Sequence, residues 1–198
     1  MGIDEDKRAT LRRFAAIGAA SPLAVVSADA VDENEVRSAI TGYLSTTPGA
    51  HFSKIRDDLK LGTGETQYHL RHLVDAGTIE TIRDGDYKRF YPAGRFDSFE
   101  KVTLGFLRRD TPRGILIGLL ADPTRSATDI ANRLDVSSAT VSQAAAELEA
   151  ASLLDREGGY TVENPEIVLS LVIRYADSFD SQAVAVADSA ASLLSYDP

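Results

Sequence analysis

The sequence contains no cysteine among its 198 residues. Disulfide bonds, zinc sites built on thiolates and thiol-based redox sensing are therefore excluded together. It also lacks any apolar stretch close to the roughly 18–20 residues that a helix needs to span a bilayer, so no membrane partner is expected. Hydrophobic residues still make up 43% of the chain, which suffices for two small globular domains, each with a modest core.

Lysine is scarce, with five lysines against 16 arginines, and the net charge is −9. An acidic, aspartate-rich and lysine-poor composition is typical of proteins from salt-loving archaea, where high salt screens self-repulsion. An ordinary acidic cytoplasmic protein is the alternative. Such a chain can bind a polyanion only through a localised positive surface.

Signatures of catalysis are missing as well. The sequence has no G-x-S-x-G, no phosphate-binding loop and no glycine fingerprint after a strand, and Gly62-Thr63-Gly64 is interpreted as a turn between helices. His69 and His72 stand three residues apart on one predicted helix, but no cysteine or nearby carboxylate completes a metal site. The sequence therefore predicts neither an enzyme nor a bound cofactor or metal.

Residues 51–91 form the most informative segment. Its pattern predicts a helix over Ser53–Leu59, a glycine-bearing turn, a second helix over Glu65–Ala76, and two strands, Ile79–Arg83 and Tyr87–Tyr91, joined by Asp84-Gly85-Asp86. Together with a preceding helix over 31–44 that Asp32 would cap, this order is typical of a winged helix-turn-helix spanning 31–92. In that fold the second helix enters the major groove of DNA and the hairpin lies along the backbone.

The same order recurs about 75 residues later, which favours an internal duplication. After a linker helix, 93–111, the second domain is predicted over 112–162. Its helices are expected at 113–120, 127–134 and 139–151, with Pro112 at the first position of the first helix and Ser138 capping the last. Residues 153–162 would form a hairpin with a Gly-Gly tip. The expected class is mainly α with small β-wings.

The N-terminal segment, 1–30, is open to two interpretations. Arg12-Arg13 precedes an apolar, alanine-rich run and a small-residue site at 28–30, the outline of a twin-arginine export signal. The alternative is an amphipathic helix over 3–20 with Leu11, Phe14, Ala15 and Gly18 on one face. Pro22 interrupts the apolar run, and no spacer residue separates the arginine pair from Phe14; both points favour the helix.

The C-terminal segment, 163–198, begins with Asn164 as cap and Pro165 at the first helical position. Apolar residues then recur every three or four positions, forming a seam that includes Val168, Val172 and Val186. Buried within one subunit, the seam would be core; buried against a second copy, it would be an interface. Because both winged domains already have cores, we expect a homodimer through this helix.

The segment HFSKIRDDLKLGTGETQYHLRHLVDAGTIETIRDGDYKRFYPAG resembles the winged helix-turn-helix of archaeal, haloarchaeal-like tandem winged transcriptional regulators, and more distantly the metal- and multidrug-responsive bacterial repressors. The second copy, ADPTRSATDIANRLDVSSATVSQAAAELEAASLL, is similar in outline. The resemblance implies sequence-specific binding of double-stranded DNA in the cytoplasm.

Within the first copy, the residues expected to contact DNA share an exposed position on a helix or on the wing. Gln67 can pair with adenine through two hydrogen bonds, and Arg71 can reach a guanine or a phosphate. The wing offers cations to phosphates or to the minor groove. The full expected set is Lys54, Thr63, Thr66, Gln67, His69, Arg71, Arg83, Lys88 and Arg89.

Charge separates the two copies. Residues 51–91 hold seven basic and seven acidic side chains, whereas residues 112–162 hold four arginines against seven acids. We therefore expect the first domain to read DNA and the second to support assembly or make a weaker contact. The alternatives are a protein-interaction adaptor built on winged domains and an exported protein.

Overall fold

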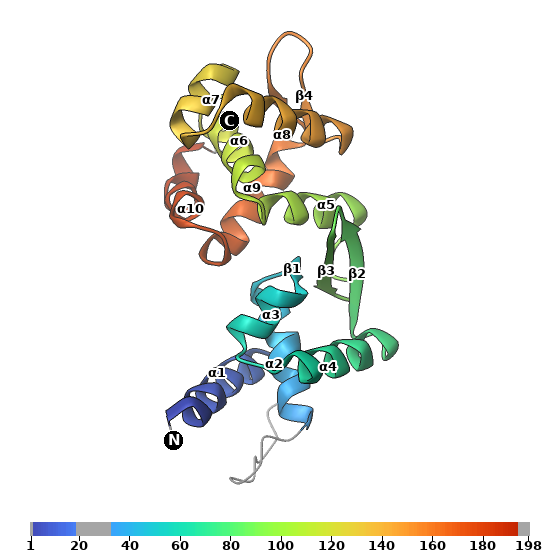
Figure 1. The fold of residues 1–198 in the computed structure, drawn as a ribbon. Helices are drawn as coiled ribbons and strands as arrows, with labels where there is room; N and C mark the ends of the chain where they lie inside the picture. The colour runs from blue at the N-terminus through green and yellow to red at the C-terminus, as the bar shows by residue number, and fades with distance from the viewer. Residues whose placement is uncertain (1, 19–32, 194–198) are drawn as a thin grey trace. The chain divides into compact units, whose positions relative to one another are not determined.

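The computed structural model describes residues 2–18 and 33–193, with side chains over 5–18 and 33–189. The described chain divides into two compact units, residues 1–97 and 98–198 (Figure 1). The expected Asp32 cap, Pro22 and the small-residue site at 28–30 lie outside the described residues. No helix among the described residues is long and apolar enough to cross a membrane.

The first unit is a winged helix-turn-helix preceded by an additional helix. Its elements are α1 (Gly2–Gly18), α2 (Glu33–Thr46), β1 (Ala50–His51), α3 (Phe52–Asp58), α4 (Thr63–Asp75), β2 (Ile79–Asp84) and β3 (Tyr87–Pro92). The hairpin is antiparallel, and β1 pairs with β3 to give the strand order β1-β3-β2. The sequence did not predict β1, because a strand of two residues has no periodicity of its own.

The unit's core lies between the helices and the hairpin. Leu11, Ile40, Ile55, Leu70 and Phe90, one from each of five elements, belong to the same buried cluster. The helices predicted at the first copy are confirmed to within two residues, and the hairpin strands to within one. Leu70 and Leu73 of α4 face the core, where both are buried.

Helix α1 packs tightly along α2 through glycine. A Cβ added at Gly42 would lie 1.9 Å from the carbonyl oxygen of Phe14, and one at Gly18 would lie 2.4 Å from the carbonyl oxygen of Ser38. The backbones therefore approach more closely than any larger side chain allows. Leu11 is fully buried in this contact, and the Phe14 ring meets Tyr43 edge to face at 5.3 Å. Residues 2–18 thus form the amphipathic helix, with the face that its apolar spacing predicts.

The second unit repeats the helix-helix-wing order and adds helices at both ends. It contains α5 (Ser98–Leu107), α6 (Asp110–Ala121), α7 (Ala127–Leu134), α8 (Ser138–Ala150), β4 (Leu154–Asp155), β5 (Thr161–Val162), α9 (Pro165–Tyr175), the 3-10 turn η1 (Ala176–Ser178) and α10 (Ser181–Leu193). The expected linking helix, α5, is part of this unit. Ser137, rather than Ser138, caps α8, and α6 begins at Asp110, so that Pro112 is its third residue.

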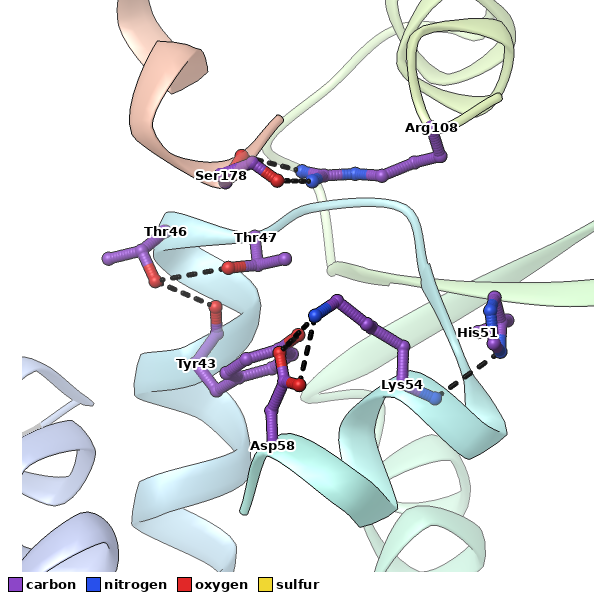
Figure 2. A network of polar contacts seen from close by, with 8 residues as sticks. All are labelled: Tyr43, Thr46, Thr47, His51, Lys54, Asp58, Arg108 and Ser178. Carbon is purple, nitrogen blue, oxygen red and sulfur yellow. Dashed lines mark hydrogen bonds and ion pairs between the residues drawn. The ribbon is translucent and has the colours of Figure 1, made fainter. Parts of the chain in front are cut away.

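The prediction of a single helix after Pro165 is wrong. Helix α9 ends at Tyr175 and the chain turns there, so that α9 and α10 pack against each other. Arg108 holds the break by donating to the carbonyl and hydroxyl oxygens of Ser178, at 2.7 and 3.0 Å (Figure 2). Asp180 then caps α10 by accepting the N–H of Ala183 at 2.9 Å.

Because the helix ends at Tyr175, the described part of the apolar seam is buried within the unit. Val168 and Val172 are fully buried, and Tyr175 and Val186 are at most 7% exposed, all within one unit. The part of the apolar seam that the structure describes is therefore core and supplies no surface for a partner. The homodimer remains a prediction from the sequence. The described part of the seam, which was its expected interface, is not available for it.

Candidate nucleic-acid interface

Helix α4 is held at its start by a short side chain-to-backbone contact. Gly62 is its N-cap, and the Glu65 carboxylate accepts the Gly62 N–H at 3.0 Å. Lys7 of α1 donates to the same carboxylate at 2.9 Å. Burial alone would raise the pKa of Glu65, but the Gly62 and Lys7 contacts outweigh it and lower that pKa. Helix α1 therefore fixes the N-terminus of α4 as well as adding to the core.

The outward side of α4 carries Gln67, Tyr68, Arg71 and Asp75, all exposed, and Thr63 is exposed at its first turn. Tyr68 is 53% exposed, which is high for a large aromatic side chain. Neither Tyr68 nor Asp75 is in the set of residues that the sequence predicted to contact DNA. The signal for both was the helical spacing, because positions 68 and 75 lie three or four residues from Arg71.

The prediction that Thr66 and His69 of α4 contact DNA is wrong, because both are buried. Thr66 is fully buried and its hydroxyl donates to the carbonyl oxygen of Gly62 at 2.9 Å; His69 is only 4% exposed. Both lie on the side of the helix that carries Leu73, since positions 66, 69 and 73 are three or four residues apart. Because His72 is exposed while His69 is buried, the two histidines do not share a face. The described residues contain no cluster of three or more metal-binding side chains.

Burial makes His69 a source of pH-dependent stability. Desolvation, followed by the nearby Arg37, lowers the pKa of His69 from 6.5, and its Nδ1 has no hydrogen-bond partner. The native ring therefore resists a proton that the unfolded chain accepts. We expect the free energy of unfolding to fall as the pH drops below about 6.5, and to continue falling until the lowered native pKa is reached.

Urea titrations between pH 7.5 and 5 test this expectation. His69→Leu should flatten the decline, leaving the part due to His51, whose pKa burial also lowers. His72→Leu, at an exposed position of the same helix, is the matched control and should keep the wild-type slope. Equal slopes in the wild type and His69→Leu would show that His69 does not contribute.

The wing places two cations side by side. In the hairpin register Arg83 lies opposite Lys88, and Asp84 lies opposite Tyr87, with Gly85 at φ +56° in the two-residue turn. Directly opposed residues project on the same face of a hairpin, and like charges there destabilise it. Neither Arg83 nor Lys88 has an ion pair within the described chain, so their juxtaposition is unfavourable unless an anion lies between them.

The prediction that Arg89, the third cation of the wing, contacts DNA is wrong. It is only 2% exposed; its guanidinium pairs with Asp84 at 2.5 Å and donates to the carbonyl oxygen of Gly49 at 3.0 Å. Residues alternate between faces along a strand, so Arg89 lies on the opposite face from Lys88. There it joins the hairpin to the loop before β1. Arg89 is a structural residue.

A groove of about 450 Å³ lies between α4 and the wing. Its polar residues are Gln67, Arg71 and Asp75 from α4 and Lys88 from β3. Its apolar residues are Phe52, Leu70, Val74 and Phe90. The structure thus brings three of the expected DNA-contacting residues to one place, and Arg83 lies beside them as the cross-strand neighbour of Lys88.

Ion pairs engage most of the other cations in residues 51–91. Lys54 donates to Asp58 at 2.9 Å, and Asp58 also accepts the Tyr43 hydroxyl proton at 2.7 Å (Figure 2). Other ion pairs of the described unit include Lys7–Glu65, Arg12–Glu35, Arg37–Glu33, Arg56–Asp57, Lys60–Asp6 and Arg89–Asp84. Arg71, Arg83 and Lys88 take part in none of them. The unpaired cations of this neutral segment therefore gather at the groove, where one carboxylate, that of Asp75, accompanies them, and on the adjacent wing.

The second unit lacks this arrangement. Its counterpart of α4 is α8, which contains no Lys or Arg. The two acids of α8 are neutralised within the unit: Glu147 pairs with Arg109, and Glu149 pairs with Arg156. The exposed residues of α8 include Ser138, Thr140, Ser142 and Gln143, giving a polar and nearly neutral face.

Comparisons with known proteins agree with the architecture. A family model for an N-terminal HTH domain matches residues 34–104, and a MarR family model matches residues 110–161; both describe regulator domains and not enzymes. A protein of Methanocaldococcus jannaschii, named as an uncharacterized HTH-type transcriptional regulator, is 28% identical over 90 residues. That match covers 46% of this chain and 22% of the relative. No solved structure matches significantly.

The first family match includes most of α5, beyond the boundary of the first unit. The second begins at the first residue of α6 and ends within the second wing. The first match therefore covers a whole helix-helix-wing order, and the second covers all of it except the last residue of β5. The two matches and the elements of both units show two consecutive winged helix-turn-helix domains, each similar to domains of transcriptional regulators.

Proposed function

We propose that the chain is a cytoplasmic, sequence-specific regulator that reads double-stranded DNA with its first winged domain. One observation carries the proposal: Gln67, Arg71 and Lys88, with Arg83 beside them, gather at the groove between α4 and the wing, and the three cations form no ion pair within the described residues. In this assignment α4 enters the major groove, where Gln67 and Arg71 meet base edges. Arg83 and Lys88 contact phosphates.

Other exposed residues complete the surface. Thr63 stands at the start of α4, where a hydroxyl can donate to a phosphate oxygen. Tyr68 extends the outward face of the helix and offers both an aromatic ring and a hydroxyl. Lys54 contributes less, because its ammonium is already paired with Asp58. Thr66, His69 and Arg89 are not part of the proposed surface, since all three are buried.

The second winged domain, in this proposal, supports assembly or makes a weaker DNA contact. The absence of Lys and Arg from α8 supports that role, because DNA affinity depends largely on neutralised phosphates. The hydroxyl-bearing side chains of α8 can still donate hydrogen bonds to a nearby backbone.

Substitution of Gln67 tests the base-reading role. Gln67→Ala should weaken binding to the preferred sequence by about 1–3 kcal/mol and leave binding to random duplex nearly unchanged. Fluorescence anisotropy in potassium chloride, on a site selected from a random library, measures both affinities.

Gln143→Ala is the matched control, because Gln143 is exposed on α8 of the second unit. It should reduce neither affinity by more than a few tenths of a kcal/mol, roughly the scale of surface substitutions. An equal loss on selected and random DNA for Gln67→Ala would remove Gln67 from base reading. A loss confined to Gln143→Ala would assign reading to the second domain.

A further inference from the structure

Asp75 is an unusual residue for a DNA-facing groove. It is exposed and lines the groove together with Arg71 and Lys88. No hydrogen bond or ion pair of Asp75 occurs within the described chain, although most acids in the core helices of this unit have a basic partner. A carboxylate in this position would repel the phosphates that the neighbouring cations attract.

The position of Asp75 also gives the helix no benefit. It is the last residue of α4, where the helix dipole is negative and a carboxylate is destabilising. Asp75 forms no ion pair within the described part of the unit, although Arg71, four residues before it on α4, lines the same groove. Asp75 therefore opposes both helix stability and general DNA affinity, which leaves selectivity as the property that it can improve.

The arrangement along α4 indicates what Asp75 selects. Gln67, Arg71 and Asp75 follow one another at intervals of four residues and line the same groove. Four helical residues advance by about 6 Å, which is close to two base-pair steps of about 3.4 Å each. A side chain one turn beyond Arg71 therefore reaches a different base pair.

We propose that Asp75 is a specificity-determining residue that accepts a hydrogen bond from the amino group of a cytosine. Among bases in the major groove, cytosine offers the N4 donor that suits a carboxylate, whereas guanine presents two acceptors. The residue thus favours cytosine at one position and penalises guanine there, at the expense of affinity for DNA in general. This inference rests on the proposed reading of DNA by the first domain.

Selection from a randomised duplex library, run with the full chain, tests the proposal. The wild type should enrich cytosine at one position, one or two base pairs from the position that depends on Arg71. Asp75→Asn should shift that position from cytosine to adenine, because asparagine pairs with adenine through two hydrogen bonds. The preference for cytosine over guanine should fall by roughly 5- to 150-fold, while binding to random duplex becomes tighter.

Asp86→Asn is the control, because Asp86 is exposed in the hairpin turn and does not line the groove. It removes the same charge and should tighten binding to all sequences without altering the selected base at any position. An unchanged selection for Asp75→Asn, or the same change for both variants, would overturn the role of Asp75. Failure of the wild type to enrich any sequence would instead overturn the proposed function.

Discussion

Replacing both Arg83 and Lys88 with glutamine is expected to weaken binding to every DNA sequence alike. The two side chains face each other across the hairpin without ion pairs, and each is assigned to a phosphate. Losing two phosphate contacts should lower the slope of log K against log salt by about two. At low salt the loss should reach about 1.5–3 kcal/mol per contact. Anisotropy titrations at several potassium chloride concentrations measure both quantities.

The hairpin itself should gain stability from the same change. Like charges directly opposed across two strands cost roughly 0.2–1 kcal/mol relative to neutral pairs, so thermal unfolding of the double variant should occur at the same or a higher temperature. This result separates a binding defect from a folding defect. Lys60→Gln is the control for charge alone, since Lys60 pairs with Asp6; its salt slope should match the wild type. A double variant with the wild-type slope would exclude the wing from phosphate binding.

Gly42→Val is expected to cause the largest loss of stability. A Cβ at this position would lie 1.9 Å from the Phe14 carbonyl oxygen and 2.7 Å from the Gly18 nitrogen, both backbone atoms. Because neither can move without displacing α1, the helix must shift or detach. Detachment would expose Leu11 and the Phe14–Tyr43 contact, so we expect a loss of about 3 kcal/mol or more. Urea unfolding followed by circular dichroism measures it.

Gly64→Ala separates the steric effect from helix propensity. Gly64 lies in α4, and a Cβ there would meet nothing within 4 Å. An exposed glycine-to-alanine change in a helix should stabilise by roughly 0.5–1 kcal/mol, the opposite sign from Gly42→Val. If Gly42→Val unfolded at the wild-type urea concentration, the close contact of α1 and α2 would not be required for stability.

Local pattern was sufficient for most of the secondary structure. The helix-helix-hairpin order of both copies, the amphipathic N-terminal helix and the start of α9 after Asn164 follow from spacing and from turn residues close in the sequence. The Asn164 side chain itself makes no capping hydrogen bond. These signals involve neighbours within about one helical turn or one hairpin, where geometry depends mainly on the chain itself. The expected roles of Gln67, Arg71 and Lys88 also depended only on which side of an element they occupy.

The burial of Arg89 could not be predicted, because it depends on a residue that is distant in the sequence. Arg89 was expected at the surface as a wing cation, but its partner Gly49 is 40 residues away. A charged residue in a strand is buried only when such partners satisfy it, and periodicity gives no information about them. His69 and Thr66 were different, since their helical spacing from Leu73 already placed them on the core side.

In the C-terminal seam, too, local spacing predicts the apolar positions, whereas long-range contacts decide the structure. Its apolar spacing continues through Phe179 without interruption, so the pattern alone predicts one long helix. The break is instead held by Arg108, 70 residues away, whose guanidinium binds Ser178 and lies 4.4 Å from the centre of the Phe179 ring. The sequence by itself determined which residues are apolar and where helices can begin. Only the tertiary structure decided that this apolar surface is covered from within the unit, because burial depends on contacts between segments that local spacing does not specify.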